Sequence, residues 1–172
     1  VPYHSLFGVL IVIILIFLNG FFTALHTGLI SLSSDKLRDL EEEGSKEAKS
    51  LLKISRNQDR LNQSFSMINS IISLVSVAFI ADRIRDSEFI LENISMKAAL
   101  IFTILLYIVV KIIFVDKIPQ RIGVRNPLGL VLNTTGILRI SLALTKPFVL
   151  LTELVTDFFM KIFGIEARVV QK

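Results

Sequence analysis

The feature that most constrains the fold is a long run without charge near the start of the chain. No Asp, Glu, Lys or Arg occurs from Leu6 to Leu32, and His26 is the only titratable side chain there. About 20 consecutive apolar residues cross a bilayer, so this run is long enough to span one. A secretory signal peptide is disfavoured, because its apolar core has only about 7–15 residues and follows positive charge. Neither Lys nor Arg precedes Leu6.

Two further apolar runs follow. Residues 61–81 contain no charged side chain, and residues 98–115 contain one lysine. We therefore predict an all-α integral membrane protein, with residues 1–172 as a single transmembrane domain and spans at about 6–33, 61–81 and 98–118. Pro119 is expected to end the third span, because proline cannot continue the hydrogen-bond ladder of a helix.

Amphipathic stretches flank these spans. Residues 34–56 are predicted to form short juxtamembrane helices, broken at Gly44 and resting a partly apolar face on the membrane. Residues 127–164 are apolar enough for a fourth span, but their charges fall on one helical stripe at steps of seven and then four: Arg139, Lys146, Glu153, Asp157 and Lys161. A charged stripe is typical of a helix lying in the interface. A cytoplasmic-side belt of juxtamembrane helices is therefore favoured over a fourth span.

Basic residues are distributed unevenly between the connections. The N-terminal flank has none, residues 36–60 hold seven, and residues 82–97 hold three. Short cytoplasmic connections carry the excess of Lys and Arg, so we predict a multi-pass protein with its N-terminus outside and its C-terminus cytoplasmic. The predicted location is the plasma membrane, for example a bacterial inner membrane, with the lipid bilayer as partner. The net charge of +4 follows this topology, so nucleic acid is not an expected partner.

Polar side chains inside the spans indicate where function resides. In the second span they recur at steps of four and three along one face: Asn62, Ser66, Asn69, Ser73 and Ser76. The first span carries Asn19, Thr23, His26, Thr27 and Ser31, and the third ends with Lys111, Asp116, Pro119 and Gln120. Hard cations such as Mg²⁺ prefer oxygen ligands. The alternative is helix packing, in which Ser, Thr and Asn form hydrogen bonds between spans.

Single residues in these runs have simpler interpretations. His26 is expected to be a hydrogen-bonded interior side chain rather than a ligand. Lys111 is expected to reach the interface along its alkyl stem, with a charge pair to Asp116 as the alternative. A helix break at Pro119 is expected to free backbone carbonyls as further ligands.

No enzyme is predicted. The chain has no Cys, which excludes disulfides and Cys-based metal sites, and its only histidines are His4 and His26. It also lacks the HExxH, GxSxG and glycine-rich phosphate-binding motifs.

Three segments together resemble one family of membrane proteins. Residues 21–33, followed by Lys36-Leu37-Arg38, resemble the opening of the transmembrane domain of the CNNM/CorC magnesium transporters. Residues 57–69 resemble the start of that family's second helix. Residues 116–120 (Asp-Lys-Ile-Pro-Gln), then Arg125-Asn126-Pro127, resemble its Gly-Glu-x-x-Pro-Lys/Gln signature and the Arg-Asn-Pro after it. The likeness covers essentially the whole chain in the same order and spacing.

The resemblance implies a homodimer with three spans and a juxtamembrane belt in each protomer. It also implies a CBS pair after residue 172 that binds nucleotide, magnesium as the transported substrate and sodium as a candidate coupling ion. The family's magnesium site takes oxygens from all three spans, and by position these fall on Thr23, Asn69, Ser73 and Asp116. The implied function is a divalent-cation transporter or exporter. The alternative is a non-conducting membrane anchor and dimerisation module for a cytoplasmic regulatory domain.

The chain departs from the family pattern at several of these positions. Thr23 stands in place of Ser, Ser73 in place of Asn, and Asp116 in place of Glu, while Ile68 replaces a glycine. Each proposed ligand keeps an oxygen, but the side chain of Asp is one methylene shorter than that of Glu. These replacements predict a changed or lost ion preference.

Overall fold

The computed structural model describes residues 3–85 and 95–163, and within these ranges every element is a helix. In chain order the helices are α1 (Tyr3–Ser31), α2 (Ser34–Glu42), α3 (Lys46–Ser55), α4 (Gln58–Arg85), α6 (Met96–Lys111), the π-helix η1 (Ile112–Lys117), α7 (Ile118–Arg125), α8 (Pro127–Asn133) and α9 (Thr135–Ile162). The predicted all-α fold is confirmed. Residues 86–94 of the predicted connection and residue 164 of the predicted belt lie outside the described residues.

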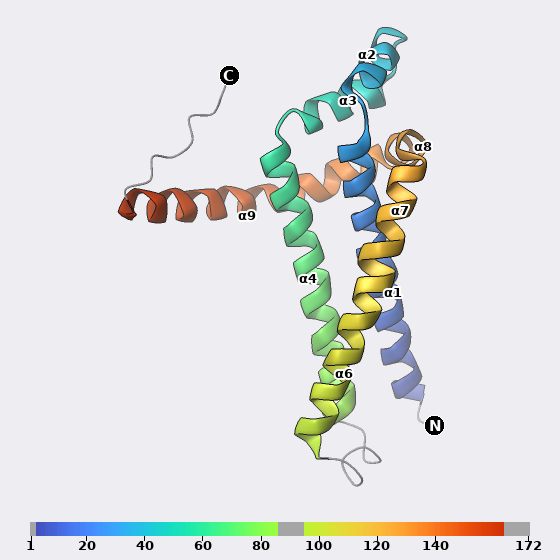
Figure 1. Ribbon diagram of the computed structural model, residues 1–172, viewed down its shortest axis with the longest axis vertical. Coiled ribbons are helices and arrows are strands. Elements are labelled where there is room, and N and C mark those ends of the chain that lie inside the picture. Colours follow the sequence, from blue (N-terminus) through green and yellow to red (C-terminus); the bar gives the residue numbers. More distant parts are fainter. Residues whose placement is uncertain (1–2, 86–94, 164–172) are drawn as a thin grey trace.

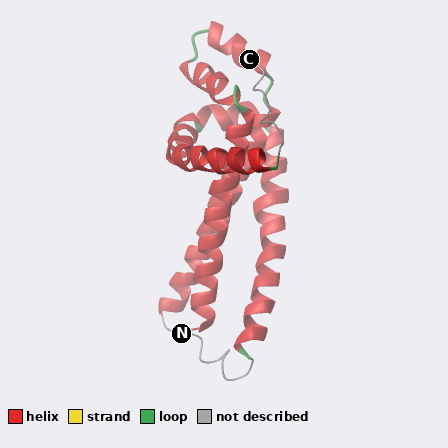
Figure 2. Ribbon diagram, turned by 90° about the vertical axis from the view of Figure 1, so that its left-hand side faces the viewer, coloured by secondary structure: helices red, strands yellow, loops and turns green. Residues whose placement is uncertain are grey.

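Three helices are long and apolar enough to cross a membrane: Phe7–Ser31, Gln58–Arg85 and Met96–Arg125. They run side by side, with α1 against α4 and the third span, α6–η1–α7, completing the bundle (Figures 1 and 2). Large apolar side chains face outward from each span, for example Phe17, Leu74 and Phe102, which are 67%, 70% and 70% exposed. Such outward faces are the surfaces that lipid covers, since a bilayer is as apolar as the side chains themselves.

The prediction that Pro119 ends the third helix is wrong, because the helix continues through Pro119 to Arg125. The π-helical turn before the proline explains this continuation. The Ile118 N–H donates to the Ile113 carbonyl five residues back, and Pro119 then occupies the first turn of α7. A proline is tolerated in a first turn, where its missing N–H is not needed. The second span is also longer than predicted, since α4 runs from Gln58 to Arg85.

The flanking helices gather at the end of the bundle opposite the N-terminus (Figures 1 and 2). Gly44, with φ of 93°, separates α2 from α3, as predicted. α9 runs crosswise to the spans (Figure 1) and bends by 68° from α8. This direction supports the predicted interfacial belt, whereas a fourth span is supported only by the length and apolar composition of α8 and α9.

A cluster of buried apolar side chains lies where the flanking helices meet α1 and α4. Five of them come from five different helices: Leu25, Leu37, Leu51, Phe65 and Val131 are each at most 1% exposed. Close approach of backbones holds α1 against the third span. A Cβ built on Gly123 would lie 2.4 Å from the Ala24 carbonyl oxygen. Small residues allow such contacts between membrane helices, and here they fix how α7 sits on α1.

Candidate cation site between the spans

The polar faces of α1 and α4 meet near the middle of the bundle. Asn19 Nδ2 donates to Ser73 Oγ at 2.9 Å and to the Asn69 carbonyl at 3.4 Å. Asn69 Nδ2 in turn donates to Thr23 Oγ1 at 3.4 Å. The Thr23 hydroxyl donates to the Asn19 carbonyl one turn earlier, at 3.2 Å. Two side chains from each helix therefore form one connected group, which we call the amide cluster (Asn19, Thr23, Asn69 and Ser73).

The amide cluster holds two oxygen acceptors without a donor. Asn19 Oδ1 and Asn69 Oδ1 are both buried, and no described residue donates a hydrogen bond to either. Asn19 as a whole is only 1% exposed. An unsatisfied buried acceptor costs about 1–3 kcal/mol, and native structures contain few of them. Two such acceptors on facing spans are free to accept a hydrogen bond or to coordinate a cation.

A third free acceptor comes from the π turn of the neighbouring span. The two N–H groups able to reach the Phe114 carbonyl along the helix belong to residues 118 and 119. Ile118 donates instead to Ile113, and Pro119 has no N–H. This carbonyl faces α1 at Gly20, where a built Cβ would lie 2.8 Å from its oxygen. On α1, Asn19 therefore contributes a buried amide oxygen without a donor, and the adjacent Gly20 lies in close contact with the Phe114 carbonyl of η1.

Asp116 lies in the same π turn and supplies the anionic group. Its Oδ2 is 3.5 Å from Lys111 Nζ, and the two side chains are 35% and 32% exposed. The charge pair between them was the alternative interpretation of Lys111, and the structure supports it. No hydrogen bond within the described ranges joins Asp116 to the amide cluster. The carboxylate is therefore neutralised by a lysine of its own helix.

Three of the four predicted ligands, Thr23, Asn69 and Ser73, come together through hydrogen bonds, whereas Asp116 is in the π turn of the third span. Their role as ligands stays a prediction. Asn19 was part of the polar run on the first span but not of the predicted ligand set, although it stands one helical turn before Thr23. Pro119 was expected to free backbone carbonyls, but the predicted set did not name that of Phe114. Pro119 lies five residues after Phe114 and has no N–H, which could have identified this carbonyl.

Other members of the polar runs have local partners. His26 Nε2 lies 2.8 Å from Asn62 Oδ1, and its ring stacks on Phe65 at 4.6 Å between centroids. The predicted hydrogen bond of His26 is confirmed, but the side chain is half-buried rather than interior, and its partner Asn62 is exposed. The Ser76 hydroxyl donates to the Ile72 carbonyl at 2.8 Å. These groups therefore belong to helix packing rather than to the amide cluster.

The donor chemistry of the site suits a hard cation. Amide, hydroxyl and carbonyl oxygens with one carboxylate are ligands for Mg²⁺ or Ca²⁺, not for softer metals. Among the described residues, no group of three or more His, Cys, Asp or Glu side chains could hold a metal ion. Any cation here would rely mainly on neutral oxygens, as ions do where broken helices expose carbonyls in transporters.

A bundle of three long apolar helices with polar side chains buried between them is the transmembrane domain of a multi-pass membrane protein. Residues 10–172 match the model of the Cyclin M transmembrane N-terminal domain. The chain therefore belongs to the CNNM family, which is associated with divalent-cation transport, and the resemblance seen in the sequence is confirmed.

A curated relative supports the same assignment. The chain is 26% identical over 166 residues to a UPF0053 protein of Haemophilus influenzae. The match covers 96% of this chain and 37% of that protein. The chain thus spans little more than a third of the length of the curated relative it matches.

Proposed function

We propose that this domain moves a divalent cation, with magnesium as substrate, through a site between its three spans. The observation that carries this proposal is the pair of buried amide oxygens, Asn19 Oδ1 and Asn69 Oδ1, that no described donor satisfies. Both oxygens would coordinate a bound cation, and this contact would remove the cost of burying them without a hydrogen bond.

The third span would complete the site. The Phe114 carbonyl lacks a helix donor and faces α1, and Asp116 is two residues further along the same π turn. π turns are frequent at functional sites. In this mechanism a cation arriving at Asp116 displaces the Lys111 ammonium, and α1 and α4 each contribute one amide oxygen, from Asn19 and Asn69. Magnesium keeps several waters and binds few protein oxygens, so a single carboxylate is sufficient for such a site.

A non-conducting anchor and dimerisation module is the second candidate, and the Lys111–Asp116 pair favours it. A carboxylate already neutralised within its own helix at 3.5 Å does not require an external ion. The close contact of Gly123 with α1 is likewise explained by packing alone. In this alternative the domain would position a cytoplasmic regulatory unit.

Magnesium-dependent stability tests the site. The purified domain is unfolded thermally with and without MgCl₂, at matched ionic strength, as wild type, Asn69→Ala and Asp116→Ala. A ligand that binds only the folded state stabilises it by about 2.7 kcal/mol at roughly 100 times Kd. We expect wild type to gain stability and both variants to lose most of that gain. Equal stabilisation of all three proteins would show that the site assignment is wrong.

Ion flux separates the two functions. The domain is reconstituted in liposomes loaded with a magnesium-sensitive dye, and external magnesium is raised with and without a sodium gradient. A transporter gives influx above empty vesicles, which Asn69→Ala reduces, and dependence on the gradient would identify sodium as the coupling ion. Flux equal to that of empty vesicles supports the anchor.

The wider assembly is part of the same proposal. The seven basic residues of 36–60 lie on α2, on α3 and its C-cap, and on the first turn of α4, at the end of the bundle where α8 and α9 also gather (Figure 1). By the positive-inside rule, we propose that this end faces the cytoplasm and that the N-terminus lies outside. The membrane that we propose is a plasma membrane, such as a bacterial inner membrane. We expect a homodimer, with nucleotide bound through a CBS pair after residue 172. Cysteine accessibility at both ends of α4 tests the orientation.

A further inference from the structure

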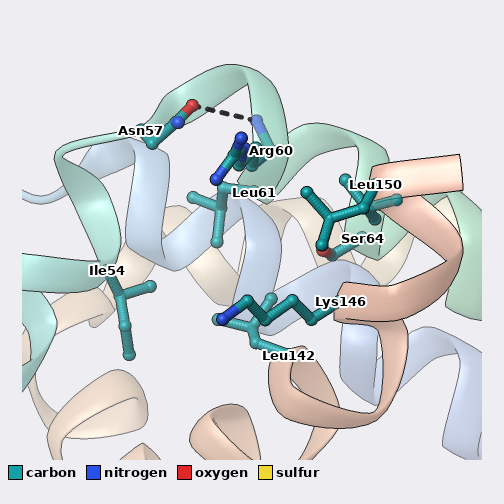
Figure 3. A pocket seen from close by; sticks show the side chains of 9 residues that line it. Ile54, Asn57, Arg60, Leu61, Ser64, Leu142, Lys146 and Leu150 are labelled. Atoms are coloured by element: carbon teal, nitrogen blue, oxygen red, sulfur yellow. Dashed lines mark hydrogen bonds between the residues drawn. The ribbon is translucent and has the colours of Figure 1, made fainter. Parts of the chain in front are cut away.

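A pocket lies away from the amide cluster, where α9 crosses the start of α4. Its volume is about 160 Å³, and its lining comes from the end of α3, the first turns of α4 and the middle of α9. Figure 3 shows Asn57 and Arg60 on one side of the pocket and Leu142 and Lys146 on the other. Two helices far apart in sequence therefore form a single concave site.

The lining of this pocket is both apolar and basic. Leu61, Leu142 and Val149 supply hydrocarbon surface, with Leu61 and Val149 each only 3% exposed. Arg60 and Lys146 supply positive charge. This combination is unsuited to a metal cation, which the basic groups would repel, and suited to an anion attached to an apolar body.

Of the two basic side chains, Arg60 has an acidic partner and Lys146 has none among the described residues. Arg60 forms a bidentate pair with Glu153 on α9, with Nε–Oε1 of 2.9 Å and Nη2–Oε2 of 3.1 Å. This pair ties α4 to α9 beside the pocket. Lys146 forms no ion pair with any described residue, so its ammonium adds an uncompensated positive charge to the lining.

The pocket lies at the depth of lipid headgroups. It sits where the charged helices α2 and α3 give way to the apolar part of α4, beginning at Leu61. Basic pockets between membrane helices on the cytoplasmic side bind anionic headgroups. Its volume is well below the roughly 300–1,000 Å³ of pockets for drug-sized ligands. It therefore suits the phosphate and glycerol part of a lipid, leaving the acyl chains in the bilayer.

We propose that this pocket binds the headgroup of an anionic phospholipid, with the phosphate on Lys146 beside Arg60 and the glycerol carbons against Leu61 and Leu142. A bound lipid would hold α9 against α4 together with the Arg60–Glu153 pair. This proposal is independent of ion transport and rests on the proposed orientation, which puts this end of the bundle on the cytoplasmic side of the membrane.

Native mass spectrometry of the purified chain tests this proposal. The protein is released from micelles supplemented with phosphatidylglycerol or, separately, phosphatidylcholine, and bound lipids are counted. The variants are Lys146→Gln, Lys146→Arg, and Lys161→Gln as a matched loss of charge on α9 outside the pocket. A basic residue near an anionic lipid surface contributes roughly fivefold in affinity. We expect wild type, Lys146→Arg and Lys161→Gln to retain phosphatidylglycerol alike, and Lys146→Gln to retain it about fivefold less.

Three results would overturn the proposal. Equal retention of the two lipids by wild type would show that the pocket does not select an anion. An equal loss in Lys146→Gln and Lys161→Gln would assign the effect to general surface charge. Displacement of phosphatidylglycerol by millimolar inorganic phosphate would identify a site for a free anion rather than for a lipid.

Discussion

The substitution Gly123→Ala tests whether the contact between α1 and α7 positions the third span. A Cβ at this position would lie 2.4 Å from the Ala24 carbonyl oxygen and 3.0 Å from the Gly28 nitrogen. Both are backbone atoms of α1, which cannot rotate away as a flexible side chain does. Since optimal contacts lie at about 3.5–4.0 Å, α7 has to move from α1 by about 1 Å.

The cost of this movement follows from two opposing terms. Overpacking costs typically about 1–3 kcal/mol, and a contact with backbone places it at the upper end. Alanine is about 1 kcal/mol better than glycine in a helix interior, so we expect a net loss of about 2 kcal/mol. The shift also moves the Phe114 carbonyl and Asp116 away from Asn19, so divalent-cation binding is expected to weaken as well.

Gly136→Ala is the matched control, because a Cβ on Gly136 meets nothing within 4 Å. We expect it to leave stability unchanged or to raise it by up to about 1 kcal/mol. Both variants are unfolded in the same micelles by heat and by denaturant, and magnesium is then titrated into each. If Gly123→Ala is as stable as Gly136→Ala and binds magnesium like wild type, the argument from backbone contact is refuted.

Three further predictions concern single interactions. Asn19→Leu removes a buried oxygen without a donor together with the hydrogen bond to Ser73, and because these two effects oppose each other, the stability of the metal-free domain should change by less than about 1 kcal/mol. The stabilisation by magnesium in thermal unfolding should disappear. Retained stabilisation would exclude Asn19 as a ligand. A double-mutant cycle on Arg60 and Glu153 should give a coupling free energy of about 0.2–1 kcal/mol. Because these side chains are 50% and 28% exposed, the coupling should fall as the salt concentration is raised. A coupling unaffected by salt would contradict this reasoning. Lys111→Gln should tighten magnesium binding by up to about fivefold, because the Asp116 carboxylate loses its lysine partner, and weaker binding in a magnesium titration would show that Lys111 does not compete with the ion.

Much of the amide cluster was predictable because a helix repeats every 3.6 residues. The steps of four and three that place Asn69 and Ser73 on one face of α4 hold in any straight helix. The same argument places Asn19 and Thr23 together on α1. That the two faces meet follows from the cost of exposing amides and hydroxyls to lipid. Only the structure showed that Asn19 belongs to the amide cluster, because its side chain contacts Ser73, which is 54 positions away in the sequence.

The sequence alone determined an all-α membrane domain with three spans and a break at Gly44, because charge-free length and glycine conformation act locally. The tertiary structure decided the rest. Helix periodicity contains no signal for the π turn at Ile112–Lys117, which carries the third span past Pro119 and frees the Phe114 carbonyl. The structure also decided between interpretations that the sequence had left open, since Lys111 pairs with Asp116 in the same helical span and α9 runs crosswise to the spans. The path of α9 depends on contacts between residues distant in the chain, which no local pattern specifies.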